Sequence, residues 1–141
     1  MLDTDICIYV IKNRPPGLRG RFNAHSQHLC ISSVTLAELL YGAEKSAKPD
    51  HNLAVVESFA ARLTVSPFGD KAAAHYGQIR ADLERKGKPI GPYDLMLAGH
   101  ARSEGLALVT NNAREFMRVK GLRVENWVGR ARPRAPAAGP A

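Results

Sequence analysis

Short β-rich runs alternate with helical patterns along almost the whole chain, and this alternation narrows the possible folds more than any other feature. The β-rich runs are Leu29–Ser32, Leu63–Pro67, Leu106–Thr110 and Leu122–Trp127, with Met1–Leu2 as the stub of another. The helical patterns cover Ser33–Ser46, Asp50–Leu63, Asp70–Gly87 and Pro92–Gly105. Strands that alternate with helices favour a parallel sheet covered by helices on both faces, which is an α/β fold.

Local signals support the helix boundaries. In the first helical pattern, Leu36, Leu39, Leu40 and Ala43 recur at the spacing of one helix face. Pro92 is suited to the first position of the last helix. Glycines at positions 87 and 105 follow two of the patterns and are typical of residues that end a helix.

A length of 141 residues indicates one domain, which we expect to span residues 1–128. The remainder, 129–141, consists of Gly, Ala, Pro and Arg and has no large apolar residue, so we expect a disordered tail. No apolar run approaches the roughly 18–20 residues needed to cross a bilayer. The N-terminus also lacks the features of a signal peptide. We therefore expect a soluble, cytoplasmic protein that does not interact with membranes.

The formal net charge of +7 favours a polyanionic partner such as a nucleic acid. Three of the positive charges lie in the tail, so the domain itself is less basic. Cys7 and Cys30 lie in apolar stretches and form no CxxC pair, which indicates small buried side chains. The five histidines lack the spacing of a zinc site, and we expect none of them to be a metal ligand.

Four acidic residues stand just after a predicted strand or early in the helix that follows it: Asp3, Glu38, Asp94 and Glu115. In an open parallel sheet, functional sites form outside the carboxyl ends of the strands. Each acid also has a purely structural explanation: Asp3 or Asp5 as a helix N-cap, Thr35 to Glu38 as a capping box, Asp94 beside a helix dipole, and Glu115 as a partner of Arg114 or Arg118.

Carboxylates gathered at one edge of a sheet repel one another unless a cation is present. Mg²⁺ and Mn²⁺ prefer carboxylate oxygens and water to the side chains of His or Cys. Because the chain supplies acids at comparable places and no His/Cys cluster, the expected metal is Mg²⁺, for which Mn²⁺ can substitute.

Four stretches that carry these acids occur in a fixed order: MLDTDICIYVIK, ISSVTLAELLYGAEKS, GPYDLMLAGHA and VTNNAREF. They resemble the motifs of PIN-domain ribonucleases, specifically the VapC-type toxins of bacterial toxin–antitoxin pairs. The resemblance runs from about Met1 to Trp127. It implies a compact three-layer α/β/α domain with a central, mainly parallel sheet and the activity of a metal-dependent endoribonuclease.

By this resemblance, Asp3, Glu38 and Asp94 match the acidic metal-binding core of the family. Glu115 falls where many relatives have Asp, and Asn112 is the polar residue that commonly precedes it. Thr4 and Ser33 would support the site by hydrogen bonding, and Asp5, where many relatives have Asn, would add a negative charge beside it. A further departure is the first strand, since only two residues precede Asp3.

Our hypothesis for the mechanism is that Asp3 and Asp94 bind the principal ion directly. Glu38 would bind that ion or orient the attacking water, and Glu115 would complete a second or outer site. The sequence leaves open whether one ion or two take part.

Basic residues near the acids are candidates for RNA contacts: Lys12, Arg14, Arg19, Arg21, Arg80, Arg85, Lys86 and Lys88. The resemblance implies a structured RNA substrate, often the anticodon region of a tRNA and initiator tRNA in particular. It also implies a homodimer and a cognate antitoxin that assembles with the toxin into a larger complex. A groove beside Ser33–Ser46 is a candidate contact site for the antitoxin, with the alternative that Leu39, Leu40 and Tyr41 are ordinary core residues. Trp127 is expected to anchor the last strand.

Two other functions are open at this stage. A phosphatase of the haloacid dehalogenase type also begins with a strand and Asp-x-Asp, but this chain lacks a convincing downstream Lys and paired-Asp motif. A non-catalytic RNA- or protein-binding module on the same fold is the second alternative. A pure binding module has no need of clustered acids, which argues against it.

Overall fold

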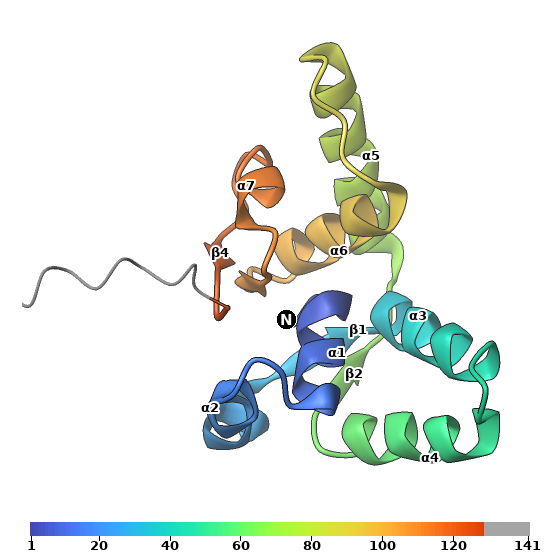
Figure 1. The fold of residues 1–141 in the computed structure, drawn as a ribbon. Helices are drawn as coiled ribbons and strands as arrows, with labels where there is room; N and C mark the ends of the chain where they lie inside the picture. Colours follow the sequence, from blue (N-terminus) through green and yellow to red (C-terminus); the bar gives the residue numbers. More distant parts are fainter. Residues whose placement is uncertain (129–141) are drawn as a thin grey trace, which may run out of the picture.

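The structure is a computed structural model that describes residues 1–128 (Figure 1). The helices are α1 (Thr4–Lys12), α2 (Leu18–His25), the 3₁₀ turn η1 (Ser26–His28), α3 (Ser33–Glu44), α4 (Pro49–Ala60), α5 (Asp70–Arg85), α6 (Pro92–Ser103) and α7 (Ala113–Phe116). The strands are β1 (Cys30–Ser32), β2 (Thr64–Ser66), β3 (Leu108–Val109) and β4 (Val124–Glu125). The tail for which we predict disorder lies outside the described residues.

The strands pair in parallel, as the alternation of elements predicts. Cys30 lies opposite Thr64 in the β1–β2 pair, and Leu108 lies opposite Val124 in the β3–β4 pair. The chain start joins the two pairs, because Leu2 bridges in parallel to Val109 and its N–H donates to the carbonyl of Cys30 at 2.9 Å. The order across the sheet is therefore β2, β1, Met1–Asp3, β3, β4, with the short first strand at the centre.

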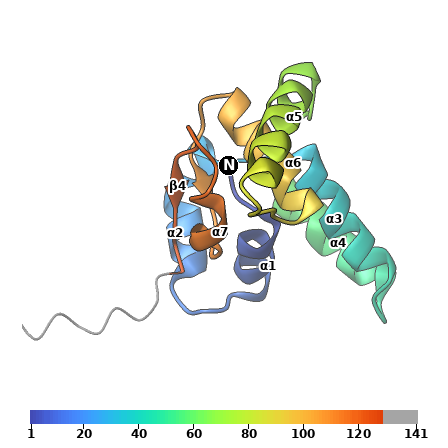
Figure 2. The same cartoon turned by 90° about the horizontal axis from the view of Figure 1, so that it is seen from above.

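Side chains of successive strand residues enter two different cores, so helices cover both faces of the sheet. Leu2, Ile31 and Val109 pack with α1, α2, α3 and α4. Met1 and Leu108 pack with α5, α6 and the region around α7. Figure 1 shows α5, α6 and α7 on one side of the strands, and α3 and α4 lie side by side in both views (Figures 1 and 2). This confirms the three-layer α/β/α architecture.

Helices α1, α2 and α7 were not predicted from the sequence. The first begins directly after the central strand, where Asp3 is its N-cap, which confirms one of the two N-cap candidates. It ends at Asn13, which adopts the left-handed conformation with φ 54°.

The prediction that Thr35 and Glu38 form a capping box is wrong. The N-cap of α3 is Ser32, whose Oγ accepts a hydrogen bond from the N–H of Val34 at 3.1 Å. Thr35 is already inside the helix and fully buried. The helix begins immediately where strand β1 ends, which leaves no room for a later cap.

Ser32 also ties α3 to α6. Its Oγ lies 2.8 Å from Nδ1 of the buried His100, while the other ring nitrogen lies 3.3 Å from Oε1 of Glu104. Cys7 is buried and Cys30 is half-buried, and both are free thiols. Within residues 1–128, no helix has the length and apolar character to pass through a bilayer.

Candidate active site

Asp3 stands at the carboxyl end of the central strand, between β1 and β3. Its N–H donates to the carbonyl of Val109 at 2.9 Å, and its Oδ1 accepts from the N–H of Ile6 at 2.9 Å. The residue is only 3% exposed. Strand pairing on one side and helix capping on the other therefore hold this carboxylate in one position.

Burial raises the pKa of Asp3 from 3.8 to about 6. Hydrogen bonds from the Thr110 hydroxyl and the Ile6 amide act in the opposite direction, whereas the charges of Asp5 and Asp94 add to the increase. Desolvation and like charge both disfavour the ionised form of a carboxyl group. Keeping Asp3 ionised in the folded protein therefore costs free energy.

Asp94 lies in the first turn of α6, which begins at Pro92 as the sequence predicts. Burial is the main cause that raises its pKa to about 6, followed by the charges of Glu115, Asp5 and Glu38. No hydrogen bond from residues 1–128 offsets these effects. The negative charges of Glu115, Asp5 and Glu38 therefore all act on the carboxylate of Asp94.

Glu38 projects from α3 and is held by Thr4. The Thr4 hydroxyl donates to Glu38 Oε1 at 2.7 Å and lies 3.2 Å from the hydroxyl of Thr35. Because Thr4 is the first residue of α1, this contact joins the two helices beside Asp3. The supporting hydrogen bond that we predict for Thr4 is therefore made to Glu38.

Glu115 is linked to Asp3 through a chain of polar contacts. Asn112 Nδ2 donates to Glu115 Oε2 at 2.8 Å, and the Asn112 backbone N–H donates to Thr110 Oγ1 at 2.8 Å. The hydroxyl of Thr110 is in turn hydrogen-bonded to Asp3. Thr110 is fully buried at the end of β3. Its role was not predicted from the sequence, where the available signal was a polar residue that ends an apolar strand directly before Asn111 and Asn112.

Ser33 has a different partner from the one expected. Its Oγ accepts a hydrogen bond from the N–H of Phe68 at 3.0 Å, which joins the start of α3 to the segment after β2. Within residues 1–128, no hydrogen bond connects Ser33 to the acids. Asp5 is exposed, and its charge acts on both Asp3 and Asp94.

The acids form a set of hard oxygen donors. Within residues 1–128, no three His, Cys, Asp or Glu side chains lie close enough together to hold one ion between them. Mg²⁺ does not require such a cage, because it keeps several waters and is commonly bound through one or two carboxylates. The pKa values of both Asp3 and Asp94 are raised, mainly by burial, and neither carboxylate has a cationic partner among residues 1–128, so the two residues fit that mode.

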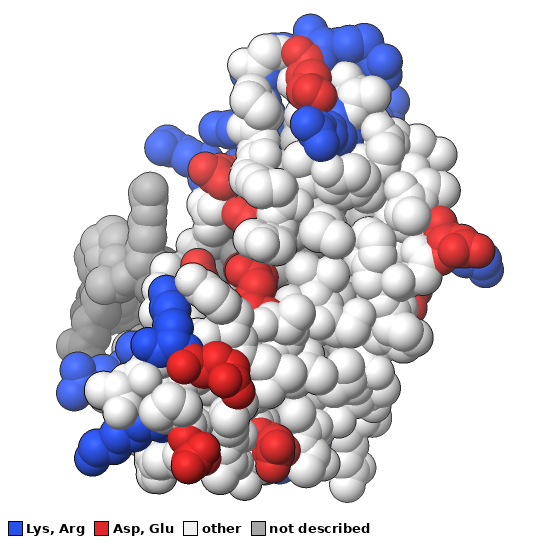
Figure 3. All heavy atoms as spheres, turned by 90° about the vertical axis from the view of Figure 1, so that its right-hand side faces the viewer, with Lys and Arg blue, Asp and Glu red and all other residues white. Residues whose placement is uncertain are grey.

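Several of the basic residues have structural partners. Arg80 pairs with Glu84 at 3.3 Å and Lys86 pairs with Asp82 at 2.9 Å, both along α5. Arg19 donates to backbone carbonyls at the end of α1. Figure 3 shows positive side chains towards two ends of one face, with acidic side chains beside and between them.

An apolar groove of about 280 Å³ begins beside Glu38. Ile8 and Ile11 of α1, Leu39 of α3 and Val55 of α4 contribute to its wall. Leu39 is buried and Leu40 is half-buried against the core, whereas Tyr41 is 66% exposed. The alternative that these are ordinary core residues is therefore confirmed for Leu39 and Leu40 and is wrong for Tyr41.

Trp127 packs against the core cluster of the N-terminal helices, as expected. The Arg21 guanidinium lies 4.9 Å from the centre of its ring.

Comparison with known proteins identifies the class to which this fold and its set of acids belong. Residues 1–122 match the family model of the PIN domain. The chain belongs to the PIN-domain family.

Similar proteins narrow this assignment. The tRNA(fMet)-specific endonuclease VapC of Shigella flexneri is 61% identical over 127 residues, which cover 90% of this chain and 96% of that protein. The DNA-bound VapBC structure from Salmonella typhimurium matches with a TM-score of 0.86 and 60% identity, covering 90% of this chain and 96% of that one. VapBC2 from Rickettsia felis, bound to a promoter DNA fragment, matches with a TM-score of 0.84 and 41% identity, covering 90% and 97%. Within the PIN-domain family, the chain is a VapC-type ribonuclease.

Proposed function

We propose that this protein is a Mg²⁺-dependent endoribonuclease toxin that hydrolyses a phosphodiester bond of tRNA. The observation that carries the proposal is the environment of Asp94. Its carboxylate is half-buried, is repelled by the charges of Glu115, Asp5 and Glu38, and receives no hydrogen bond within residues 1–128. A carboxylate held at such a cost has a function in binding or catalysis more often than in stability.

Asp3 and Asp94 are the residues that would hold the ion, with Glu38 beside them. Bound Mg²⁺ supplies positive charge for the phosphate and lowers the pKa of a bound water. Thr4 fixes one oxygen of Glu38, so its other oxygen is available to orient the attacking water. Glu115, positioned by Asn112, would complete a second or outer site.

The names and extent of the similar proteins support tRNA as the substrate. Relatives at 61% and 60% identity are named tRNA(fMet)-specific endonucleases, and the matches span 96% of their length. We therefore propose the initiator tRNA, and its anticodon region, as the target in the cytoplasm.

The similar structures of VapBC complexes support an antitoxin as the protein partner. The groove beside Glu38 is the site we propose for it, because a segment seated there would lie next to a catalytic acid and could block access to RNA. Assembly into a homodimer, and into a larger complex with the antitoxin, stays a prediction.

The test is incubation of the purified protein with total tRNA, with cut positions mapped to the nucleotide. We expect cleavage with Mg²⁺, none with EDTA, and recovery when Mg²⁺ or Mn²⁺ is added back. Cleavage that persists in EDTA would contradict the metal dependence. Tight binding of tRNA without any cut in Mg²⁺ would instead identify a non-catalytic binding module.

A further inference from the structure

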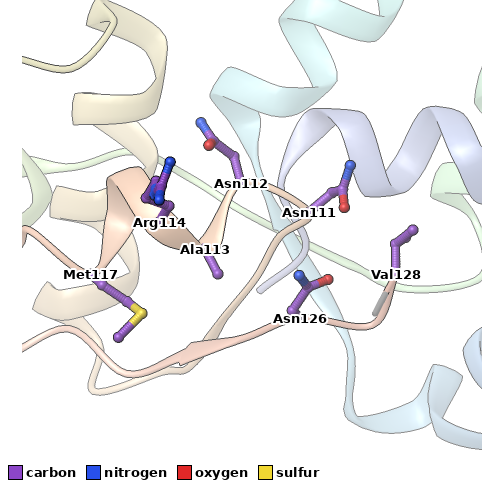
Figure 4. A pocket seen from close by; sticks show the side chains of 7 residues that line it. All are labelled: Asn111, Asn112, Ala113, Arg114, Met117, Asn126 and Val128. Atoms are coloured by element: carbon purple, nitrogen blue, oxygen red, sulfur yellow. The ribbon is translucent and has the colours of Figure 1, made fainter. Parts of the chain in front are cut away.

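A pocket of about 840 Å³ is lined by Asn112 and by side chains of mixed polar and apolar character. The loop after β3, helix α7 and the segment after β4 form its walls (Figure 4). Asn112 belongs both to this pocket and to the active site, because its amide donates to Glu115. A ligand in the pocket would therefore lie next to the scissile bond of a substrate held at the acids.

The walls carry an unusual concentration of carboxamides. Asn111, Asn112 and Asn126 contribute to the lining together with Arg114 and Met117. A carboxamide offers a donor and an acceptor in one plane, which matches the edge of a nucleobase. Asn111 makes one long contact, 3.4 Å from its Nδ2 to the Tyr9 hydroxyl, and no hydrogen bond within residues 1–128 engages the Asn126 side chain.

The carboxamides of Asn111 and Asn126 extend from a backbone whose position is fixed by the sheet. The N–H of Thr110, directly before Asn111, donates to the carbonyl of Glu125, directly before Asn126, at 2.9 Å. The next residue, Trp127, is packed against the core. The two asparagines thus extend from adjacent parallel segments whose positions are set by the sheet.

We propose that this pocket receives an unpaired purine base of the RNA, adjacent to the cleaved bond and read by Asn111 and Asn126. The proposal rests on the proposed ribonuclease function and adds a base preference to it. Asparagine recognises adenine and arginine recognises guanine by paired hydrogen bonds, whereas cytosine is read by acidic side chains, which this lining lacks. Met117, 74% exposed at the pocket wall, supplies apolar surface for a base face. Unpaired bases are the part of RNA that proteins read in this way.

The test measures binding in EDTA, so that it does not depend on cleavage. Two fluorescent hairpin RNAs with identical stems are used, one with a loop of adenosines and one with a loop of uridines. The wild-type protein should bind the adenosine loop about tenfold more tightly, within the range of one paired base contact. Asn111→Ala combined with Asn126→Ala should bring the two affinities within about twofold. Asn23→Ala, which changes an exposed asparagine on α2, is the matched control and should retain the full preference.

A wild-type protein without purine preference would overturn the proposal, and so would a preference that survives in the double variant. Thermal melts of all variants check that the fold is intact. The Mg²⁺-dependent cleavage of total tRNA, measured separately, tests the ribonuclease function. Cleavage by the wild type together with an unchanged base preference in the double variant would leave the ribonuclease standing and remove only the base pocket.

Discussion

Asp94 is the clearest case of a residue whose position in the fold lowers stability. Its pKa is raised to about 6 by burial and by the surrounding acids, and no donor within residues 1–128 compensates it. Removing such a charge relieves repulsion in the metal-free protein, although it would also remove one of the proposed metal ligands. Stability and activity should therefore respond in opposite directions to the same substitution.

We predict that Asp94→Asn lowers tRNA cleavage by about a hundredfold and raises the free energy of unfolding in EDTA at pH 7.5 by about 1 kcal/mol. The side chain keeps its size, so the fold should be retained. Cleavage assays and thermal melts measure the two effects. Cleavage within about threefold of wild type would argue against the assignment. Asp50→Asn is the control, since it removes a favourable charge from the first turn of α4 and should leave cleavage unchanged.

Thr110 is a positioning residue, through which Asp3 is connected to the loop that carries Asn112 and Glu115. Thr110→Val preserves shape but removes the hydroxyl, so we expect cleavage to fall about tenfold. Thr110→Ser should restore most of the activity, because it keeps the hydroxyl. A structural role alone would predict the reverse, since Val fills the buried site better than Ser. The pH profile of cleavage gives a second readout, because loss of the hydrogen bond should raise the pKa of Asp3 further.

At this scale the positions of the acids, of Thr4 and of Asn112 could be predicted from the sequence, whereas Thr110 and the partner of Ser33 could not. Asp3, Glu38, Asp94 and Glu115 stand at comparable places after strands, and it was their occurrence together that pointed to one site. Thr110 was hidden because threonine is also a common strand residue. The partner of Ser33 was unpredictable because Phe68 lies 35 residues away, in a segment without regular structure.

Helices α5 and α6 pack so closely that a glycine is required between them. A Cβ atom at Gly99 would lie 2.8 Å from the backbone nitrogen of Tyr76 and 3.1 Å from the carbonyl oxygen of Ala72. Backbone atoms cannot move aside without shifting a helix. Since α6 also carries Asp94, this contact helps to set the position of the active site.

We expect Gly99→Ala to lower the free energy of unfolding by about 1–3 kcal/mol through overpacking. Gly77→Ala, in the exposed middle of α5 with no heavy atom within 4 Å of the added Cβ, is the matched control. It should stabilise the protein by about 0.5–1 kcal/mol, because alanine favours the helix. Urea denaturation of both variants measures the two signs. Equal effects of the two substitutions would show that α5 and α6 are not in this close contact.

Helix α1 illustrates what the sequence hides at the scale of elements. Its run from Ile6 to Ile11 is rich in β-branched residues and carries no clear helical periodicity. Tertiary packing decides the outcome, since Ile6, Cys7 and Val10 are buried on one face while Asp3 and Asn13 cap the two ends. The longer helices α3 to α6 were predictable because their boundaries carry Pro or Gly signals, or an apolar face.

For the whole molecule, the sheet order explains why residues from four distant parts of the chain meet. The short segment Met1–Asp3 lies between β1 and β3, so Asp3 stands at the centre of the carboxyl edge. The alternation of strands and helices predicted a parallel sheet. It could not predict the order of the strands, because that order depends on crossovers between distant segments. Convergence of the acids was therefore a prediction from the fold class.

The buried acids predict an unusual pH dependence of the metal-free protein. Asp3 has a pKa of about 6 in the folded protein against 3.8 as its ordinary value, so the folded state binds this proton more tightly. Its contribution to stability is therefore present below about pH 4 and is lost as the pH rises towards 6 and above. The difference amounts to about 3 kcal/mol.

Urea denaturation in EDTA at pH 4.5 and pH 7.5 measures this effect when wild type is compared with Asp3→Asn. Asparagine can still cap α1, so the substitution removes the titration and keeps the cap. The stability gain from Asp3→Asn should be larger at pH 7.5 than at pH 4.5. A gain that is the same at both values would mean that Asp3 has an ordinary pKa.

The most direct measurement is a titration with Mn²⁺, in which electron paramagnetic resonance detects the free ion. We predict that the wild-type protein binds Mn²⁺ and that Asp3→Asn, Asp94→Asn and Glu38→Gln each weaken this binding about tenfold or more. Asp82→Asn, which changes an acid on α5 that pairs with Lys86, should bind as wild type does. Equal affinity in all five proteins, or no binding by the wild type, would contradict a metal site formed by these acids.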